Sequence, residues 1–162
     1  MRLMHHLLVS AMAIYSHSTT LSPPATAFPQ HLYLSPDNFA FETTLASRTF
    51  AHWIKELKNA GYAFHLFFLW LPAAEFAIAR VAERVKMGGH NVPEETITRR
   101  YHAGLKNFFN LYIPLADSWY FYDNSQGTKP LLLASGEKQT GTVVNNKVLW
   151  EQITEAYCGS SL

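Results

Sequence analysis

The residues of this sequence whose types and spacing suggest chemistry are four arginines, Arg80, Arg84, Arg99 and Arg100, which flank the motif GGHNVP at residues 88–93. Guanidinium groups bind phosphate oxygens through paired hydrogen bonds and stabilise the charge on a phosphoryl group in transfer. Arg80 and Arg84 are four residues apart and share a helix face. Arg99 and Arg100 point about 100° apart on a helix, so only one of them can reach the same target. The alternative is a solvated, charged helix face.

A second candidate site is Glu42-Thr43-Thr44, at the end of a strand expected over residues 39–44. A carboxylate with two hydroxyls can hold the hydroxyls of a sugar or orient a water on a magnesium ion. Ligands of α/β sheets bind outside the carboxyl ends of the strands, which is where this triplet lies. The alternative is that Glu42 pairs with an arginine and that the threonines cap the next helix.

From Phe39 onward, strand patterns alternate with helix patterns, which predicts an α/β fold with a mainly parallel sheet flanked by helices. Helices are indicated where apolar residues recur at helical spacing, as Trp53, Ile54 and Leu57 do. The expected elements are strands at 39–44, 62–71, 118–125, 130–135 and 143–144, and helices beginning near 47, 72, 93 and 147.

Several residues predict where these helices begin and end. Ser47 is a plausible N-cap and Pro93 a plausible first residue of a helix, because both residue types are favoured at helix starts. Gly61 and the pair Gly88-Gly89 are expected to end helices, because glycine adopts the left-handed conformation that follows a last turn.

The composition argues against several classes of function. A net charge of +1 and a pI near 7.9 give no field that would attract nucleic acid or an acidic membrane surface. The single cysteine, Cys158, cannot form an internal disulfide, which favours a reducing compartment such as the cytoplasm. The eight histidines show no HExxH or Cys/His spacing, so no metal site is predicted.

The N-terminal segment, residues 1–36, differs from the rest of the chain. Prolines at 23, 24, 29 and 36 interrupt any regular element, which predicts a poorly structured or non-homologous segment ahead of a domain at residues 37–162. The alternative is a secretory signal, with the apolar run Leu7–Tyr15 and a cleavage site at Ala25-Thr26-Ala27. That run is shorter than the ~20 residues that cross a bilayer.

Residues 38–135, with GGHNVP ahead of the arginine pair, resemble the C-terminal part of a zeta-toxin-like P-loop kinase. The resemblance implies a partial P-loop kinase fold and an ATP- or GTP-dependent phosphotransferase that uses Mg²⁺. In the best-known toxin members of the family, the acceptor is a UDP-linked amino sugar. An antitoxin is a partner that the resemblance also implies.

The resemblance also suggests roles for the candidate residues. Glu42 and Thr43, with Thr44 beside them, fall where the family's strand-end Glu-x-Thr contacts the substrate, although this chain has Thr where the toxins have Gly. The region that supplies the family's contacts to nucleotide phosphates contains Arg80, Arg84, His90, Arg99 and Arg100. Arg84 and Arg100 are the candidates for catalytic residues.

The sequence departs from the family at the phosphate-binding loop, because no GxxxxGK[ST] occurs in it. Asp37 lies too close to Glu42 to be the family's catalytic aspartate. The expectation is therefore a truncated, catalytically deficient member whose fold lacks the N-terminal strand and the P-loop. Two alternatives remain: one half of a split kinase, completed by another chain at an exposed apolar sheet edge, or a non-catalytic module that binds a nucleotide sugar or a protein.

Overall fold

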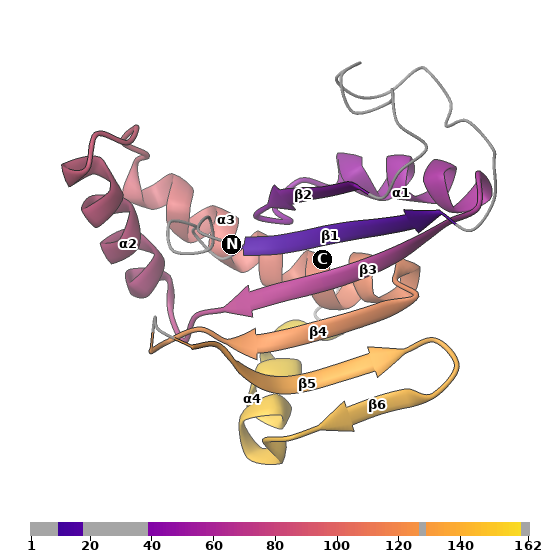
Figure 1. Ribbon diagram of the computed structural model, residues 1–162. Coiled ribbons are helices and arrows are strands. Elements are labelled where there is room, and N and C mark those ends of the chain that lie inside the picture. Colours follow the sequence, from indigo (N-terminus) through magenta and orange to yellow (C-terminus); the bar gives the residue numbers. More distant parts are fainter. Residues whose placement is uncertain (1–9, 18–38, 127–128, 160–162) are drawn as a thin grey trace.

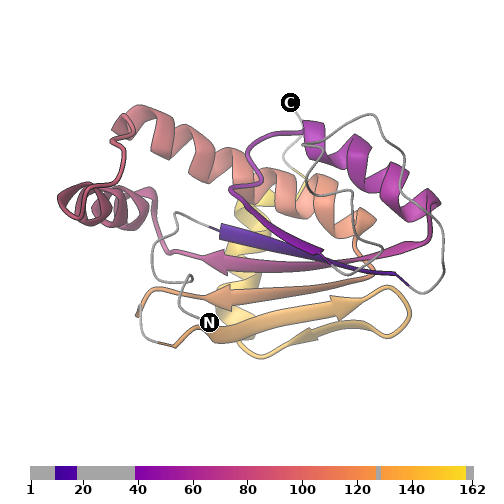
Figure 2. The same cartoon turned by 45° about the horizontal axis from the view of Figure 1, so that its top comes forward.

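The computed structural model describes residues 10–17, 39–126 and 129–159 of the 162-residue chain. One sheet forms the centre of the molecule, and α1, α3 and α4 pack against one of its faces (Figures 1 and 2). The helix α2 projects beyond the end of the sheet and packs against α3. The elements in chain order are β1 (Ser10–His17), β2 (Phe39–Thr43), α1 (Thr49–Asn59), β3 (Tyr62–Trp70), α2 (Ala74–Lys86), α3 (Glu94–Asn107), β4 (Ser118–Asp123), β5 (Leu131–Glu137), β6 (Gly141–Val144) and α4 (Lys147–Tyr157).

The sheet has the strand order β2-β1-β3-β4-β5-β6. The expected α/β class with flanking helices is confirmed, but the expectation of a mainly parallel sheet is wrong. Only β3 and β4 pair in parallel, and the other four neighbouring pairs are antiparallel. The β5–β6 pair is antiparallel because only residues 138–140 join the two strands, and a short turn reverses the chain. The antiparallel pairs of β1 join segments that are distant in the sequence. The parallel pair has α2 and α3 in its long crossover.

The strand β1 lies between β2 and β3 and is antiparallel to both. Its Met12 is the register partner of Glu42 on one side and of Phe67 on the other. These residues belong to the segment 1–36 that the sequence predicts to be poorly structured, and the structure instead gives residues 10–17 a place inside the sheet. The cleavage site considered at Ala25-Thr26-Ala27 lies outside the described residues, and the boundary at residue 37 stays a prediction.

Because β1 opposes both of its neighbours, β2, β3 and β4 all run in the same direction. Their carboxyl ends, Thr43, Trp70 and Asp123, therefore meet at one edge of the sheet. We call this the carboxyl edge. In Figure 1 the arrowheads of β3 and β4 point toward α2, so the helical pair α2–α3 stands beside this edge.

Aromatic side chains fill the space between the sheet and its helices. Phe68 and Phe121 stack across the parallel pair, and Phe108 lies over both with ring centroids 4.7 and 5.1 Å away. Phe108 opens a π-helical turn, Phe108–Tyr112, that continues α3. The predicted apolar face of α1 is confirmed, since Trp53, Ile54 and Leu57 are buried. Aromatic rings contribute large apolar areas, so this cluster anchors α3 to the sheet.

The helix boundaries follow the sequence signals closely. Gly61 and Gly88 have φ angles of 90° and 91°, in the left-handed region expected after a helix end. The helix α3 begins at Glu94, one residue after the predicted start, and Pro93 is its N-cap. At the start of α1 the N-cap residue is Arg48 rather than Ser47, but the Ser47 hydroxyl still accepts a hydrogen bond from the backbone N–H of Thr49 at 3.2 Å.

Candidate functional site at the carboxyl edge

The triplet Glu42-Thr43-Thr44 ends β2 and begins a tight turn. Thr43 Oγ1 accepts a hydrogen bond from the N–H of Leu45 at 3.1 Å, and Thr44 Oγ1 accepts one from the N–H of Ala46 at 3.5 Å. Leu45 has a φ of 55°, which is uncommon for a side chain of its size. The threonines therefore hold this turn rather than cap α1, and each hydroxyl keeps its proton for donation to a ligand.

The carboxylate of Glu42 is exposed at this edge. Within the part of the chain that the structure describes, Glu42 takes part in no ion pair, so the alternative of an arginine partner is not seen there. An exposed carboxylate at the end of a strand is available to accept hydrogen bonds from the hydroxyls of a ligand.

The turn after β2 is fixed by α3 and the π-helical turn. Asn107 Nδ2 donates to the carbonyl oxygens of Leu45 and Ala46 at 2.7 and 3.2 Å, and the Tyr112 hydroxyl donates to Ser47 O at 2.5 Å. Gly104 lies directly against the carbonyl oxygen of Thr44, where a side chain would not fit. These contacts set the position of the Glu42 turn relative to the helix that carries Arg99 and Arg100.

Arg80 joins α2 to the carboxyl edge. Its Nη2 donates to the carbonyl oxygen of Asn124 at 2.5 Å, and the N–H of Asn124 donates to Trp70 O at 2.9 Å. Desolvation by burial lowers the pKa of Arg80, and the nearby Glu83 carboxylate acts in the opposite direction. The arginine is thus half-buried at the point where β3 and β4 end, with further N–H groups left to bind an anion.

Arg84 and His90 also come together, but through the backbone. Arg84 Nη2 donates to the carbonyl oxygen of His90 at 3.1 Å, while the imidazole of His90 is exposed. The Arg84 side chain lies against Gly89, and Arg84 Nε is buried without a hydrogen-bond partner. Arg84 therefore holds the turn between α2 and α3, in which Gly88, Gly89 and His90 lie.

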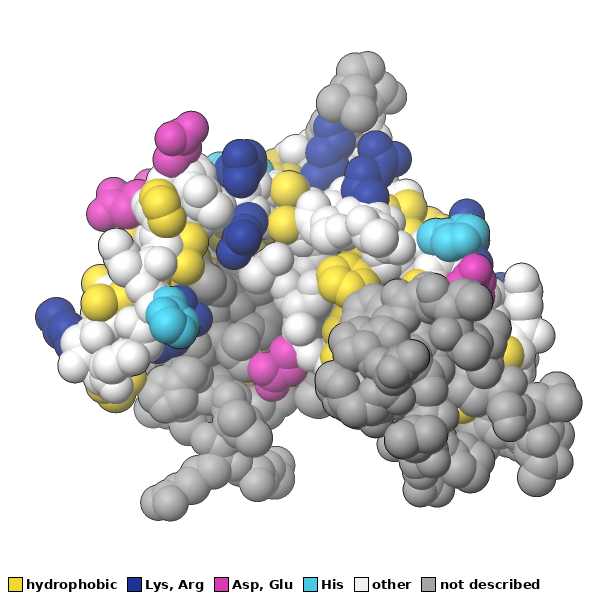
Figure 3. Space-filling view, turned by 90° about the horizontal axis from the view of Figure 1, so that it is seen from above, with side chains coloured by type: hydrophobic (Ala, Val, Ile, Leu, Met, Phe, Trp, Pro, Cys, Tyr) yellow, Lys and Arg dark blue, Asp and Glu magenta, His cyan; other side chains and the backbone are white. Residues whose placement is uncertain are grey.

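Arg99 and Arg100 lie on α3 and are both exposed. Among the described residues, neither Arg99 nor Arg100 takes part in an ion pair. The space-filling view in Figure 3 shows Lys and Arg side chains in separate small groups with neutral and apolar side chains between them. The structure thus brings Arg80 to the carboxyl edge and leaves the arginine pair on the surface of the adjoining helix.

Asn124 and Asn107 are residues of this edge that the sequence reasoning did not select. Asn124 follows β4 and is buried, and its neighbour Asp123 accepts a hydrogen bond from the N–H of Ser125 at 2.8 Å. The polar run after the β4 pattern carries the same signal as Glu42-Thr43-Thr44, since both follow the carboxyl end of a strand. Asn107 has no such signal, because its role depends on the packing of α3 against the β2 turn.

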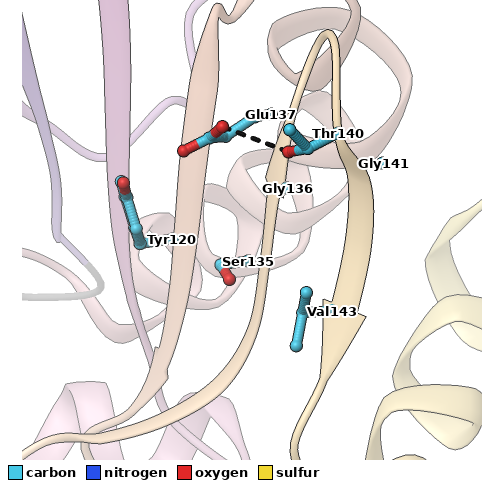
Figure 4. A pocket seen from close by; sticks show the side chains of 7 residues that line it. All are labelled: Tyr120, Ser135, Gly136, Glu137, Thr140, Gly141 and Val143. Carbon is cyan, nitrogen blue, oxygen red and sulfur yellow. Dashed lines mark hydrogen bonds between the residues drawn. The ribbon is translucent and has the colours of Figure 1, made fainter.

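A separate cavity of about 130 Å³ lies between β4, β5 and β6 (Figure 4). It is lined by Tyr120 and Ser135, and Thr140 Oγ1 donates to Glu137 Oε2 at 3.1 Å at its rim. Pockets for drug-sized ligands occupy about 300–1,000 Å³, so this cavity is too small for a nucleotide. No group of three or more His, Cys, Asp or Glu residues within the described ranges is placed to hold a metal ion.

Three features define the class of this protein: a parallel strand pair with a helical crossover, a carboxylate and hydroxyls at the carboxyl edge, and an arginine hydrogen-bonded to that edge. They are the features of an α/β protein consistent with a partial P-loop-kinase-like fold. The profile of the Zeta toxin family matches residues 21–116, which is more than half of the chain. The chain therefore belongs to the Zeta toxin family. This is a nucleotide-binding, kinase-like family.

Among curated proteins, the chain is similar to an uncharacterized protein of Haemophilus influenzae, with 32% identity over 75 residues. The match covers 46% of this chain and 50% of the relative, so the chain spans half of that protein's length. No solved structure matches the chain. In the described residues, no helix has both the length and the apolar character needed to span a bilayer.

Proposed function

We propose that this chain supplies the acceptor-binding edge and the arginine-bearing helices of a small-molecule phosphotransferase of the Zeta toxin type, and that it does not transfer phosphate efficiently by itself. The nucleotide is ATP or GTP with Mg²⁺, and the acceptor is a UDP-linked amino sugar. The resemblance of residues 38–135 to such kinases and the match to the family support this reading.

The observation that carries the proposal is the hydrogen bond from Arg80 to the carbonyl oxygen of Asn124. It fixes a cation on α2 beside the ends of β3 and β4, at the same edge as the exposed carboxylate of Glu42. A kinase needs an anion-binding group and an acceptor-orienting group on one side of the sheet, because transfer depends on positioning and on electrostatic stabilisation.

The acceptor is placed at Glu42, Thr43 and Thr44. Carboxylate oxygens accept hydrogen bonds from sugar hydroxyls, and the two threonine hydroxyls have protons to donate. The phosphate-facing groups are Arg80 and one of the pair Arg99 and Arg100, the latter from the exposed surface of α3. Arg84, which the sequence suggested as catalytic together with Arg100, acts in this proposal by shaping the α2–α3 turn.

Low intrinsic activity follows from the absence of GxxxxGK[ST] in the sequence. Backbone amides of that loop hold the phosphates, and its lysine and hydroxyl act on the phosphates and on Mg²⁺. Without them, the Glu42 edge retains a binding function. The non-catalytic binding module is therefore the reading of this same edge that we favour for the isolated chain.

The split-kinase alternative requires an apolar sheet edge that another chain would complete. The position between β2 and β3 is instead filled by β1 of the same chain. Within the described sheet, a complementing chain would have to displace β1 or to add to the outer edge of β2 or β6. The partner that we propose from family membership is an antitoxin, and the compartment is the reducing cytoplasm, which fits the exposed free thiol of Cys158.

Calorimetry with UDP-N-acetylglucosamine tests the proposal on the full chain. Saturable binding is expected, and Glu42→Gln should weaken it by roughly tenfold to a hundredfold, since a hydrogen bond to a charged group is worth about 1.5–3 kcal/mol. The matched control is Glu155→Gln, an exposed acid on α4 far along the chain, which should leave binding unchanged.

Phosphate transfer is measured in parallel by mass spectrometry of the sugar after incubation with ATP or GTP and Mg²⁺. Little product is expected from the isolated chain. Efficient transfer that depends on Arg100 would show that the chain is a complete kinase. Absence of any heat with the nucleotide sugar would remove the acceptor assignment.

A further inference from the structure

A cavity of about 300 Å³ lies between the end of β3, α3 and α4, and Glu42 is not among the residues that line it. Its aromatic walls are Trp70, Tyr101 and Tyr157, and Leu149 and Ile153 of α4 add aliphatic surface. The volume is at the lower limit of the range for small-molecule sites, and an apolar wall with a few polar groups is the usual composition of such sites.

An unsatisfied donor lies at this cavity. The indole Nε1 of Trp70 is buried without a hydrogen-bond partner, although only 6% of the residue is exposed. The Tyr101 hydroxyl lies close to the indole and donates to Leu71 O at 2.8 Å, which leaves its lone pairs free, but no hydrogen bond of normal geometry joins the indole N–H to it. A buried donor left unpaired costs about 1–3 kcal/mol, which an incoming acceptor would recover.

None of the residues that line the cavity is an acid, a base or a histidine. Behind the lining, Glu75 acts on Tyr101, and His102 Nδ1 hydrogen-bonds the Tyr157 hydroxyl at 3.0 Å. Desolvation by burial raises the pKa of Tyr101 and that of Tyr157, so both phenols stay neutral at physiological pH. A charged ligand would lose its hydration here without direct contact with a counter-charge in the lining, whereas a neutral ring would pack against the aromatic walls.

We propose that this cavity binds an uncharged aromatic molecule that carries one hydrogen-bond acceptor, with the acceptor directed to the indole N–H of Trp70. The half-buried Tyr157, on the last turn of α4, lies beside the Tyr101–Trp70 pair, and admission of the acceptor requires its ring to turn away and to give up the 3.0 Å hydrogen bond between its hydroxyl and His102 Nδ1. The inference does not depend on the proposed kinase-like function, because none of its residues belongs to the Glu42 triplet or the arginine set.

The two walls of the site come from different parts of the chain. Trp70 and Tyr101 lie within residues 21–116, which match the Zeta toxin family, whereas Leu149, Ile153 and Tyr157 lie beyond that match. The helix α4 is held in place by Trp150, which stacks on Trp119 with ring centroids 5.5 Å apart. The cavity therefore depends on a helix outside the matched region.

The test is a titration of the ¹⁵N-labelled full chain, followed by NMR at the indole N–H groups. The chain has four tryptophans, and loss of one signal in Trp70→Phe assigns Trp70. Benzamide is the probe, toluene is the analogue without an acceptor, and benzoate is the charged analogue. Benzamide should shift the Trp70 signal saturably and leave Trp53, on α1, unchanged, and it should bind roughly threefold to tenfold more tightly than toluene.

Two variants complete the test, with binding followed by saturation transfer to the ligand. In Trp70→Phe, the aromatic wall remains but the donor is lost, so the preference for benzamide over toluene should disappear. Ala156→Phe places a ring at the exposed rim of the cavity and should abolish binding while the other indole signals stay in place. Equal affinity for all three probes, an unchanged Trp70 signal, or full binding by Ala156→Phe would overturn the proposal.

Discussion

The side chain of Arg84 lies so close to the backbone of Gly89 that a Cβ at residue 89 would stand 2.7 Å from Arg84 Cγ and 3.0 Å from Arg84 O. The N–H of Gly89 also donates to Arg84 O at 3.0 Å. The arginine and the glycine therefore form one turn between α2 and α3. The sequence suggests Arg84 as a phosphate ligand, but in the structure its side chain packs within its own helix–turn segment.

Gly89→Ala should destabilise the chain by about 1–3 kcal/mol, because the added methyl group overlaps both the Arg84 side chain and its backbone oxygen. Urea unfolding measures the change. In an Arg84→Ala background the side-chain overlap is absent, so the cost of Gly89→Ala should fall. An identical cost in both backgrounds would contradict the proposed contact.

Gly104→Ala should also destabilise the chain, although an alanine in place of a glycine normally favours a helix by about 1 kcal/mol. The reason is the carbonyl oxygen of Thr44, a backbone atom of the Glu42 turn that has no room to move away from a methyl group. We expect a net loss of about 1–3 kcal/mol in thermal or urea unfolding. Arg99→Ala, at an exposed position of the same helix, is the control and should change the free energy of unfolding by less than about 0.5 kcal/mol.

The environment of Asp117 predicts that the free energy of unfolding falls in acid. Burial by itself would raise the pKa of this carboxyl, but hydrogen bonds from Lys58 Nζ and from the N–H of Phe64 outweigh it, and the pKa is lowered. A lowered folded-state pKa stabilises the fold above the unfolded value of about 3.9, and this stabilisation is lost as the pH falls through the folded-state value.

Asp117→Asn should therefore cost about 1–2 kcal/mol between pH 5 and 7, and the difference from the natural chain should shrink below about pH 4. Urea unfolding across this pH range is the measurement. Glu155→Gln, an exposed acid, is the control. A difference that stays constant down to pH 2 would exclude the ionised carboxylate as the cause.

Arg80→Met should loosen α2 from the carboxyl edge, because it removes the donor to Asn124 O and keeps the apolar stem. Faster hydrogen exchange is expected in α2 and at the N–H of Asn124, with little change in β4. Arg99→Met is the matched control, since Arg99 is exposed and should leave exchange unaltered. Unchanged exchange in Arg80→Met would mean that α2 is held by its packing on α3 alone.

Most of the elements were predictable because their local signals are strong. The helix α4 (Lys147–Tyr157) begins at the expected residue, Lys147, after a cap in which Asn146 Oδ1 accepts from the N–H of Leu149 at 3.1 Å. The strand β3 is apolar on both faces, as a central strand requires. Helix ends at Gly61 and Gly88 follow from conformations that glycine adopts readily.

The strand β1 and the direction of pairing were not predictable in the same way. Residues 10–17 carry an apolar run that fits a strand, a signal sequence or a loose segment equally well. Only the partners β2 and β3, distant in the sequence, select the strand. Antiparallel pairing depends on these contacts, which local propensity does not contain.

The candidate site was also predictable only in part. The residue types and the strand-end rule correctly place Glu42 at the carboxyl edge. The sequence does not reveal that Arg84 donates a hydrogen bond to His90 O, or that Asn107 donates one to Leu45 O in the turn after β2. Both hydrogen bonds depend on how a helix is oriented. Spacing along the sequence identifies which arginines share a helix face, whereas the packing of the helices determines which of them has N–H groups free to bind a ligand.

The position of β1 has a consequence for cooperativity. The backbone of β2 pairs in the sheet with β1, and β1 in turn pairs with β3. Any opening that separates β1 from β3 therefore also separates β2, which carries Glu42, from the rest of the sheet. The amide protons of β2 should exchange no more slowly than those of β1, and a ligand that binds at Glu42 should protect a strand that it never touches.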